Sequence, residues 1–247
     1  RVLQVCIAAG AGDFGRDMMV GLGLLSMAVA AVFILGQADY KRMLAYSSVE
    51  HMGILMLGVG LGRGAVFGAV LHVVNHSLAK GMLFLTAGNI LTAYKTKSAA
   101  QVRGLLRALP VSGVLWVLGF LAITGSPPFG PFLSELAVLK GALDGGHAII
   151  AALYLLFLAI VFVGMTGTVL AMATTPAAAG EVAAEVAAGA APAAGAGGGG
   201  ALSPRREAPW NVLPPVVLAV LVTLLGLYVP AALQTLLHEA ARALGGS

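Results

Sequence analysis

Long runs of apolar residues, separated by short polar turns, account for most of this chain. A helix needs about 20 apolar residues to cross a bilayer core of about 30 Å, and six runs reach that length or exceed it. They are residues 18–36, 43–61, 64–93, 110–144, 148–173 and 212–230. The pattern predicts an all-α fold, a polytopic bundle of transmembrane helices.

The run 110–144 cannot be one regular helix. Its 35 residues would measure about 50 Å as a straight helix, which is too long for one regular crossing. Its middle reads Gly125-Ser126-Pro127-Pro128-Phe129-Gly130-Pro131, and proline lacks the backbone donor that a helix interior needs. We therefore expect a helix break formed by Pro127, Pro128, Gly130 and Pro131.

Two topologies fit this break: a hairpin of two short helices, or one discontinuous helix that crosses once. If it crosses once, eight loop cations lie on one side and three on the other, whereas the hairpin gives seven and four. The eight are Lys41, Arg42, Lys95, Lys97, Arg103, Arg107, Arg205 and Arg206. Because positive loops stay cytoplasmic, the stronger bias favours one crossing, with loops 37–42 and 94–109 and the segment 174–209 on the cytoplasmic side of the cell inner membrane.

The composition changes abruptly after the fifth run. Residues 174–209 are rich in Ala, Gly and Pro and show no apolar periodicity, which is typical of a flexible, disordered linker. We therefore predict three parts: a membrane domain at 1–173, the linker at 174–209, and a last transmembrane helix with a tail at 210–247.

Composition narrows the function classes. The chain is 59% hydrophobic and only 10% charged, with a mean hydropathy of +0.96, far from the roughly 25% charged residues of soluble domains. Its net charge of +4 resides in short loops that set orientation, so no nucleic-acid partner is expected. Cys6 is the one cysteine, which excludes a disulfide framework and thiolate cages. Nucleotide-binding and triad motifs are absent, so we expect no metal, no cofactor and no active site of its own.

Three ionisable residues interrupt the third run. His72, His76 and Lys80 are four positions apart, so on a helix they rise about 6 Å and drift only about 40° per step. A charge at the bilayer centre costs at least about 2.5 to 3.5 kcal/mol, and such groups usually mark an ion pathway. Histidine titrates near neutrality and burial penalises the lysine ammonium form, which suits a proton relay, with Asn75 and Ser77 holding water. The alternative is that the histidines are packed core residues bonded to a neighbouring helix.

Several motifs resemble one protein superfamily. These are the segment from Gln37 to Ser48, the ladder of His72, His76 and Lys80, and the stretch from Ser126 to Glu135. They are similar, in order and spacing, to the antiporter-like proton-pumping subunits of respiratory complex I and its relatives. Within that superfamily they look most like the component F family of hydrogenase-4, from formate hydrogenlyase-type hydrogenases.

This resemblance implies an arrangement of two inverted repeats, each with one broken helix. The chain then corresponds to the C-terminal half of an antiporter-like subunit, with its discontinuous helix at 110–144. The glutamate and lysine pair that serves the family's first half-channel is expected upstream of Arg1. The implied partners are other membrane subunits of a multi-subunit complex, the lipid bilayer and protons.

Glu135 follows the break by about one turn, so the opened backbone could hydrate its carboxylate. The family carries a lysine or glutamate here as the terminal site before proton release. The alternative reading is a snorkelling or capping carboxylate. Lys140 points about 140° away from Glu135 and is a lesser candidate.

Three further residues belong to the expected relay. Lys41 ends the polar turn at the membrane edge; it either bridges the two half-channels or is a topogenic cytoplasmic charge. Glu50 and His51 are adjacent and therefore lie on different faces of the second helix. An ion pair of Glu50 with Lys41 or Lys80 is plausible.

Three functions remain after these arguments. The first is a proton-translocating, non-redox subunit of a complex I-like or hydrogenase-4-type oxidoreductase. The second is a subunit of an Mrp-type cation/proton antiporter, which shares the fold without a redox partner. The third is a structural assembly subunit whose buried charges only pair with one another.

Overall fold

A computed structural model describes residues 2–176 and 207–244, and these are almost entirely helical. The helices are α1 (Val2–Ala8), α2 (Gly12–Ile34), α3 (Tyr40–Leu61), α4 (Arg63–Tyr94), α5 (Leu105–Ala108), α6 (Pro110–Ile123), α7 (Gly130–Asp144), α8 (Ala148–Thr174), α10 (Pro209–Leu227) and α11 (Ala231–Ala243). One 3-10 turn, η1 (Ala99–Gln101), lies between α4 and α5. The described part of the chain contains no strand, which confirms the predicted all-α fold.

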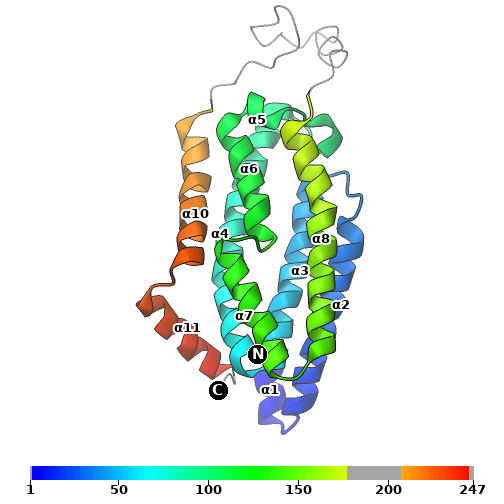
Figure 1. The fold of residues 1–247 in the computed structure, drawn as a ribbon, viewed down its shortest axis with the longest axis vertical. Coiled ribbons are helices and arrows are strands. Elements are labelled where there is room, and N and C mark those ends of the chain that lie inside the picture. The colour runs from blue at the N-terminus through cyan, green and yellow to red at the C-terminus, as the bar shows by residue number, and fades with distance from the viewer. Residues whose placement is uncertain (1, 177–206, 245–247) are drawn as a thin grey trace, which may run out of the picture.

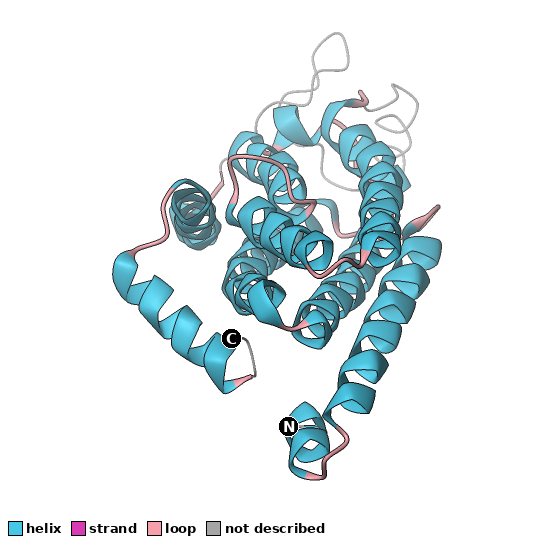
Figure 2. Ribbon diagram, turned by 60° about the horizontal axis from the view of Figure 1, so that its bottom comes forward, coloured by secondary structure: helices cyan, strands magenta, loops and turns pink. Residues whose placement is uncertain are grey.

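The long helices stand side by side along one axis (Figure 1). The helix α4 is the central element, because it packs against α3, α6, α7, α10 and α11. The pair α2 and α3 forms the largest helix–helix contact, and α8 packs on α2, α6 and α7. Seen after a turn of 60°, α10 and α11 lie on one outer side of the bundle (Figure 2).

Four of the described helices are long and apolar enough to cross a membrane: α2, α3, α8 and α10. The helix α4 is longer than any of them, at 32 residues, but its His, Asn and Lys side chains make it less apolar. Many large apolar side chains face outward, among them Val32 and Val163, which are 68% and 67% exposed. An outer surface of this kind suits contact with lipid rather than water.

The discontinuous helix crosses the bundle once, as predicted. The helices α6 and α7 follow one another along the same direction, and both pack against α4 (Figure 1). The end of α6 is a Schellman motif: Ser126 N donates to Leu121 O at 2.9 Å, Gly125 N donates to Ala122 O at 3.4 Å, and Gly125 has φ of +64°. A left-handed residue after a helix end favours glycine.

The break itself is shorter than expected. It spans residues 124–129, whereas Gly130 and Pro131 form the first turn of α7. Proline is well tolerated there, because the first N–H groups of a helix have no intrahelical partner. Only Pro127 and Pro128 of the four predicted residues therefore lie between the two half-helices.

Other elements cover the opened backbone of the break. A Cβ at Gly226 of α10 would collide with the carbonyl oxygen of Pro128, so the two backbones are in direct contact. From the other side, Asn75 Nδ2 donates to Gly130 O at 2.8 Å. Irregular backbone at membrane depth is tolerated where protein packs around it in this way.

The C-terminal part differs from the expectation. The last long helix runs from Pro209 to Leu227 rather than over 212–230, and a separate amphipathic helix, α11, follows it. In α11, His238 stacks on Phe67 of α4, with ring centroids 4.5 Å apart. Most of the predicted linker lies outside the described residues, so its disorder and the domain boundaries stay predictions.

One residue of the predicted linker has a defined role. The Glu207 carboxylate accepts hydrogen bonds from Val111 N at 2.8 Å and from Ser112 N at 3.1 Å, and the Ser112 hydroxyl donates to it as well. A carboxylate at a helix start satisfies free N–H groups and favours the positive end of the helix dipole. Glu207 thus fastens the start of α10 to the start of α6.

Candidate functional site

The ladder lies on the inner face of α4, as the spacing predicted. His72, His76 and Lys80 are 0%, 8% and 6% exposed. Their partners come from α3 on one side and from α7 on the other. The ladder is therefore a junction between a continuous helix and the broken one.

Lys80 is held by α3. Its Nζ atom donates to the Leu44 carbonyl at 2.6 Å and to the Ser47 hydroxyl. No carboxylate of the described residues lies within 4.0 Å of Lys80, so the suggested ion pair with Glu50 is not formed. Lys80 is thus a buried amine with neutral oxygen partners.

Two histidines and a serine form a chain of hydrogen bonds. His51 Nδ1 lies 2.9 Å from His72 Nε2, and His72 Nδ1 lies 2.9 Å from Ser134 Oγ. In the tautomer of His72 that carries its proton on Nδ1, this nitrogen donates to Ser134 Oγ, and the Ser134 hydroxyl donates to Pro131 O at 2.9 Å. His72 Nε2 then carries no proton and accepts from His51. All the bonds point from α3 toward α7.

The helix break places a carbonyl acceptor at the His51 end of this series of hydrogen bonds. The helical partner of the Ile123 carbonyl would be the N–H of residue 127, but Pro127 has none. The His51 ring lies near this carbonyl. A second proton on His51 can therefore be stabilised by an oxygen that the proline leaves free.

His76 completes a group of three imidazoles, named here the histidine cluster: His51, His72 and His76. The His51 ring centroid lies 5.1 Å from that of His72 and 4.7 Å from that of His76. In the described part of the chain, His76 Nδ1 is buried and has no hydrogen-bond partner. One ring nitrogen from each residue lies within 4.8 Å of the others. The sequence suggested no metal ligands, yet these three side chains could hold an ion.

Two buried carboxylates flank the cluster. Glu50 and Glu135 are 2% and 7% exposed, and within the described ranges the Oε1 atom of each lacks a partner. The Glu135 carboxylate rests against Gly125, where a Cβ would collide with Oε2. Tyr154 of α8 donates through its hydroxyl to the Glu135 carbonyl at 3.4 Å. Glu135 thus lies against the break, as its position one turn later predicted.

The remaining predicted residues lie apart from this centre. Lys140 forms an exposed ion pair with Asp144. Lys41 is half-buried in the first turn of α3, where Asp39 caps the helix, and among the described residues its amine has no ion-pair partner. The structure therefore does not join Lys41 to Glu50, and its role as a bridge stays a prediction.

The structure places the two polar neighbours in the ladder differently. Asn75 is buried, binds the break and has a free Oδ1 among the described residues. Ser77 is exposed and donates to Val73 O, so it cannot hold water between ladder residues. The two positions differ by about 200° around the helix, which places them on opposite faces.

Sequence reasoning gave no role to three oxygens of the site: the hydroxyls of Ser47 and Ser134 and the carbonyl of Ile123. The serines stand next to ionisable motifs, one three residues before Glu50 and the other just before Glu135. That proximity was the only available signal, because their function depends on which helices meet. The carbonyl could have been inferred from the proline four residues later.

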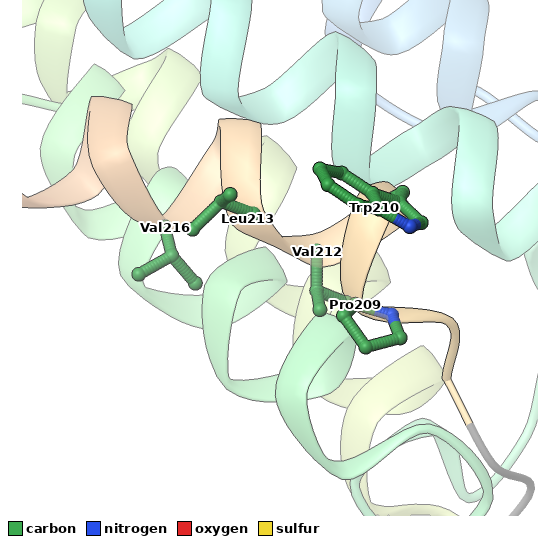
Figure 3. A pocket seen from close by; sticks show the side chains of 5 residues that line it. All are labelled: Pro209, Trp210, Val212, Leu213 and Val216. Atoms are coloured by element: carbon green, nitrogen blue, oxygen red, sulfur yellow. The ribbon is translucent and has the colours of Figure 1, made fainter.

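An apolar hollow beside the first turns of α10 lies outside this site (Figure 3). It contains no ionisable side chain, and Trp210 in it is 83% exposed. Its lining residues are Pro209, Trp210, Val212, Leu213 and Val216. This hollow suits apolar contact rather than chemistry.

The fold and the site define an integral membrane helix bundle with a buried axis of ionisable groups around one broken helix. Residues 3–169 match the family described as NADH:quinone oxidoreductase/Mrp antiporter, transmembrane. The match covers more than half of the chain, so the chain belongs to this family. The resemblance inferred from the motifs is thereby confirmed.

Individual relatives agree with this placement. The chain is 41% identical over 126 residues to a hydrogenase-4 component F homolog of Methylacidiphilum infernorum, a match that covers 51% of the chain and 26% of that relative. It superposes on respiratory complex I from Thermus thermophilus with a TM-score of 0.72 and 25% identity, over 96% of this chain and 47% of that one. For the Mrp complex from Dietzia, the TM-score is 0.74 at 22% identity, over 93% and 46%. The chain thus spans about half of each structural neighbour and a quarter of the curated relative.

Proposed function

We propose that this chain conducts protons through a membrane as part of an antiporter-like subunit of a complex I-like or hydrogenase-4-type oxidoreductase. The observation that carries the proposal is the set of contacts around the Lys80 amine. Its amine is buried and bound to neutral oxygens, with no carboxylate within 4.0 Å among the described residues. A lysine placed in this way can exist as ammonium or as amine without breaking an ion pair.

The ladder and the cluster provide a route from this lysine to the break. A proton on Lys80 passes to His76, one turn away, through intervening water. The histidine cluster then carries it: a proton taken up on one face of an imidazole releases another from the opposite face. Along the bonds described above, the proton moves from His51 to His72 and on to Ser134. The Ser134 hydroxyl then turns away from Pro131 O and releases its own proton through water toward Glu135.

The carboxylates are proposed to receive and return protons at the ends of this route. Ser134 and Glu135 are adjacent on α7, and the carboxylate of Glu135 faces the break at Gly125. Glu50 on α3 is buried, and its Oε1 has no partner among the described residues, so we propose that it exchanges protons between Lys80 and Glu135. Lys41 is proposed to connect this half-channel with another at the membrane edge.

The family and the fold support a proposal for the membrane and the partners in which this function takes place. The solved relatives named above are subunits of multi-subunit membrane complexes, and we propose similar membrane partners for this chain, in the cell inner membrane. Loops 37–42 and 94–109, which carry most of the cations, are proposed to face the cytoplasm. Redox chemistry would be performed by other subunits.

Replacing Lys80 tests the proposal directly. The variant Lys80→Met, in the reconstituted complex, should lose most of its proton transport and keep more of its redox activity. The matched control is Lys140→Met, because Lys140 lies on α7 and forms an exposed pair that contributes about 0 to 1 kcal/mol. Equal loss of both activities in Lys80→Met, or unchanged transport, would contradict the proposal.

The family description and the fold also fit an Mrp-type cation/proton antiporter. The two functions differ in what drives them. An antiporter exchanges protons for Na⁺ without a redox substrate, whereas the proposed subunit moves protons only during turnover. Transport that starts on addition of Na⁺ alone would favour the antiporter.

A further inference from the structure

The histidine cluster has the composition and geometry of a metal site. One ring nitrogen from each of His51, His72 and His76 lies within 4.8 Å of the other two. All three side chains are buried, and they come from two helices, α3 and α4. We propose that the cluster binds one divalent transition-metal ion, with Zn²⁺ the best match, and that the bound ion blocks the proton route.

The ligand type selects the class of metal. Neutral imidazole suits Zn²⁺, Cu²⁺ and Ni²⁺, whereas Mg²⁺ and Ca²⁺ require oxygen ligands. Three histidines with a water in the fourth position form a recognised tetrahedral arrangement for Zn²⁺. The cluster therefore offers the ligand number that an open zinc site uses.

Hydrogen bonds around the cluster orient two of the ligands. A metal-bound histidine usually donates its other ring N–H to a carbonyl or a hydroxyl, which fixes the ring. His72 bound through Nε2 donates Nδ1–H to Ser134 at 2.9 Å, and His51 bound through Nδ1 can donate to the Ile123 carbonyl. The outer partner of His72 is thus already bonded, and the Ile123 carbonyl near the His51 ring is available as the second.

The third ligand, His76, has a ring nitrogen that is not hydrogen-bonded within the described residues. His76 Nδ1 is buried and lacks a hydrogen-bond partner within the described residues. An unpaired buried polar atom costs free energy, and a metal bond would remove that cost. His76 also keeps 8% of its surface exposed, more than His51 or His72, so it marks the side from which an ion can enter.

Binding requires the three ring nitrogens, which lie within 4.8 Å of one another, to reach one common spacing. Zn–N bonds of about 2.0 to 2.1 Å at tetrahedral angles separate two ligand nitrogens by about 3.3 Å. His51 Nδ1 and His72 Nε2 are 2.9 Å apart, so they must move apart by a few tenths of an ångström. An ammonium group at Lys80, one turn from His76, would oppose a cation here, so binding favours the neutral amine of Lys80.

Binding would have a functional consequence. The ion takes the ring lone pairs that accept protons in the proposed relay, so no proton can pass between His51 and His72. This block rests on the proposed function, whereas binding itself depends only on the three imidazoles. The two parts can therefore fail separately.

Spectroscopy with Co²⁺ as the probe tests the binding. The purified complex that contains this chain is titrated with Co²⁺, whose visible absorption strengthens in a tetrahedral site, and then with Zn²⁺, which should displace it. The variant His76→Ala should lose the cobalt bands. The matched control is His238→Ala, which removes an exposed histidine of α11 and should keep them.

A second variant distinguishes a lost metal ligand from a misfolded protein. Ser134→Ala keeps all three ligands and removes an outer hydrogen bond, and it should weaken Co²⁺ binding about tenfold. Cobalt bands that are absent from the wild-type complex, or that are equal in wild type, His76→Ala and Ser134→Ala, would overturn the proposal. Zn²⁺ that binds at the cluster but leaves transport unchanged would overturn the block and count against the relay.

Discussion

Gly125 and Glu135 are in direct contact across the broken helix. The Cα of Gly125 lies so close to Glu135 Oε2 that a Cβ at this position would collide with it, and Gly125 also adopts φ of +64°. Gly125 thus allows the left-handed turn after α6, and its lack of a side chain leaves the space that the Glu135 carboxylate occupies.

This contact predicts a strong effect for Gly125→Ala. A left-handed non-glycine residue costs about 1 to 2 kcal/mol, and the clash displaces the carboxylate as well. We expect a lower melting temperature of the complex and reduced proton transport. Gly88→Ala is the matched control, because Gly88 lies within α4 with open space around it, and it should be neutral or stabilising by about 0.5 to 1 kcal/mol. Normal transport by Gly125→Ala would show that Glu135 does not need this position.

Ser134 is predicted to act as a link in the relay. In Ser134→Ala the His72 Nδ1–H loses its acceptor, which costs about 1 to 3 kcal/mol for a buried group. We expect proton transport to fall several-fold while Ser134→Thr, which keeps a hydroxyl, recovers part of it. Transport is measured against redox turnover in proteoliposomes. Ser77→Ala is the control, since its exposed hydroxyl bonds only to its own helix, and an equal loss in both variants would rule out a specific role for Ser134.

Glu207 is predicted to stabilise the start of α6. The variant Glu207→Ala leaves two backbone N–H groups and the Ser112 hydroxyl without their acceptor. The loss of such a cap costs about 0.5 to 2 kcal/mol. Thermal unfolding should show the destabilisation, and Glu207→Gln should restore part of it through its carbonyl oxygen. Glu239→Ala on exposed α11 serves as control, and an equal shift in both would argue against the cap.

Gly226 is predicted to set the distance between α10 and the break. A Cβ in Gly226→Ala would overlap the Pro128 carbonyl, and backbone cannot move aside as a flexible side chain can. We expect α10 to dock less tightly, which limited proteolysis near residues 207–209 would report. Gly167→Ala in α8 is the control, because nothing lies near a Cβ at Gly167. Unchanged protection in Gly226→Ala would mean that α10 is held elsewhere.

The sequence was sufficient to predict the long helices and the shared face of the ladder residues. Apolar runs of membrane length predict where helices form, and a spacing of four places His72, His76 and Lys80 on one face by geometry alone. The prolines also predicted the break from local chemistry, because proline has no backbone N–H to donate within a helix. All of these depend on neighbours along the chain.

The contacts between helices could not be predicted in the same way. His51 meets His72, and Lys80 meets Leu44, only because α3 and α4 cross at a particular height and rotation. The Lys80 amine binds neutral oxygens of α3 and not the carboxylate of Glu50. The rule that opposite charges pair does not predict this arrangement. The helix α11 was missed because its 13 residues are too short and too polar for a crossing.

The two hydrogen bonds that Lys80 donates to α3 affect how its amine can gain and lose a proton. An ammonium group has three N–H bonds, and α3 accepts two of them, at Leu44 and Ser47. The neutral amine keeps two N–H bonds, which fit the same two oxygens, so the third hydrogen is the one that leaves. Charging and discharging would then leave the lysine and both helices where they are, and only water would have to reorganise.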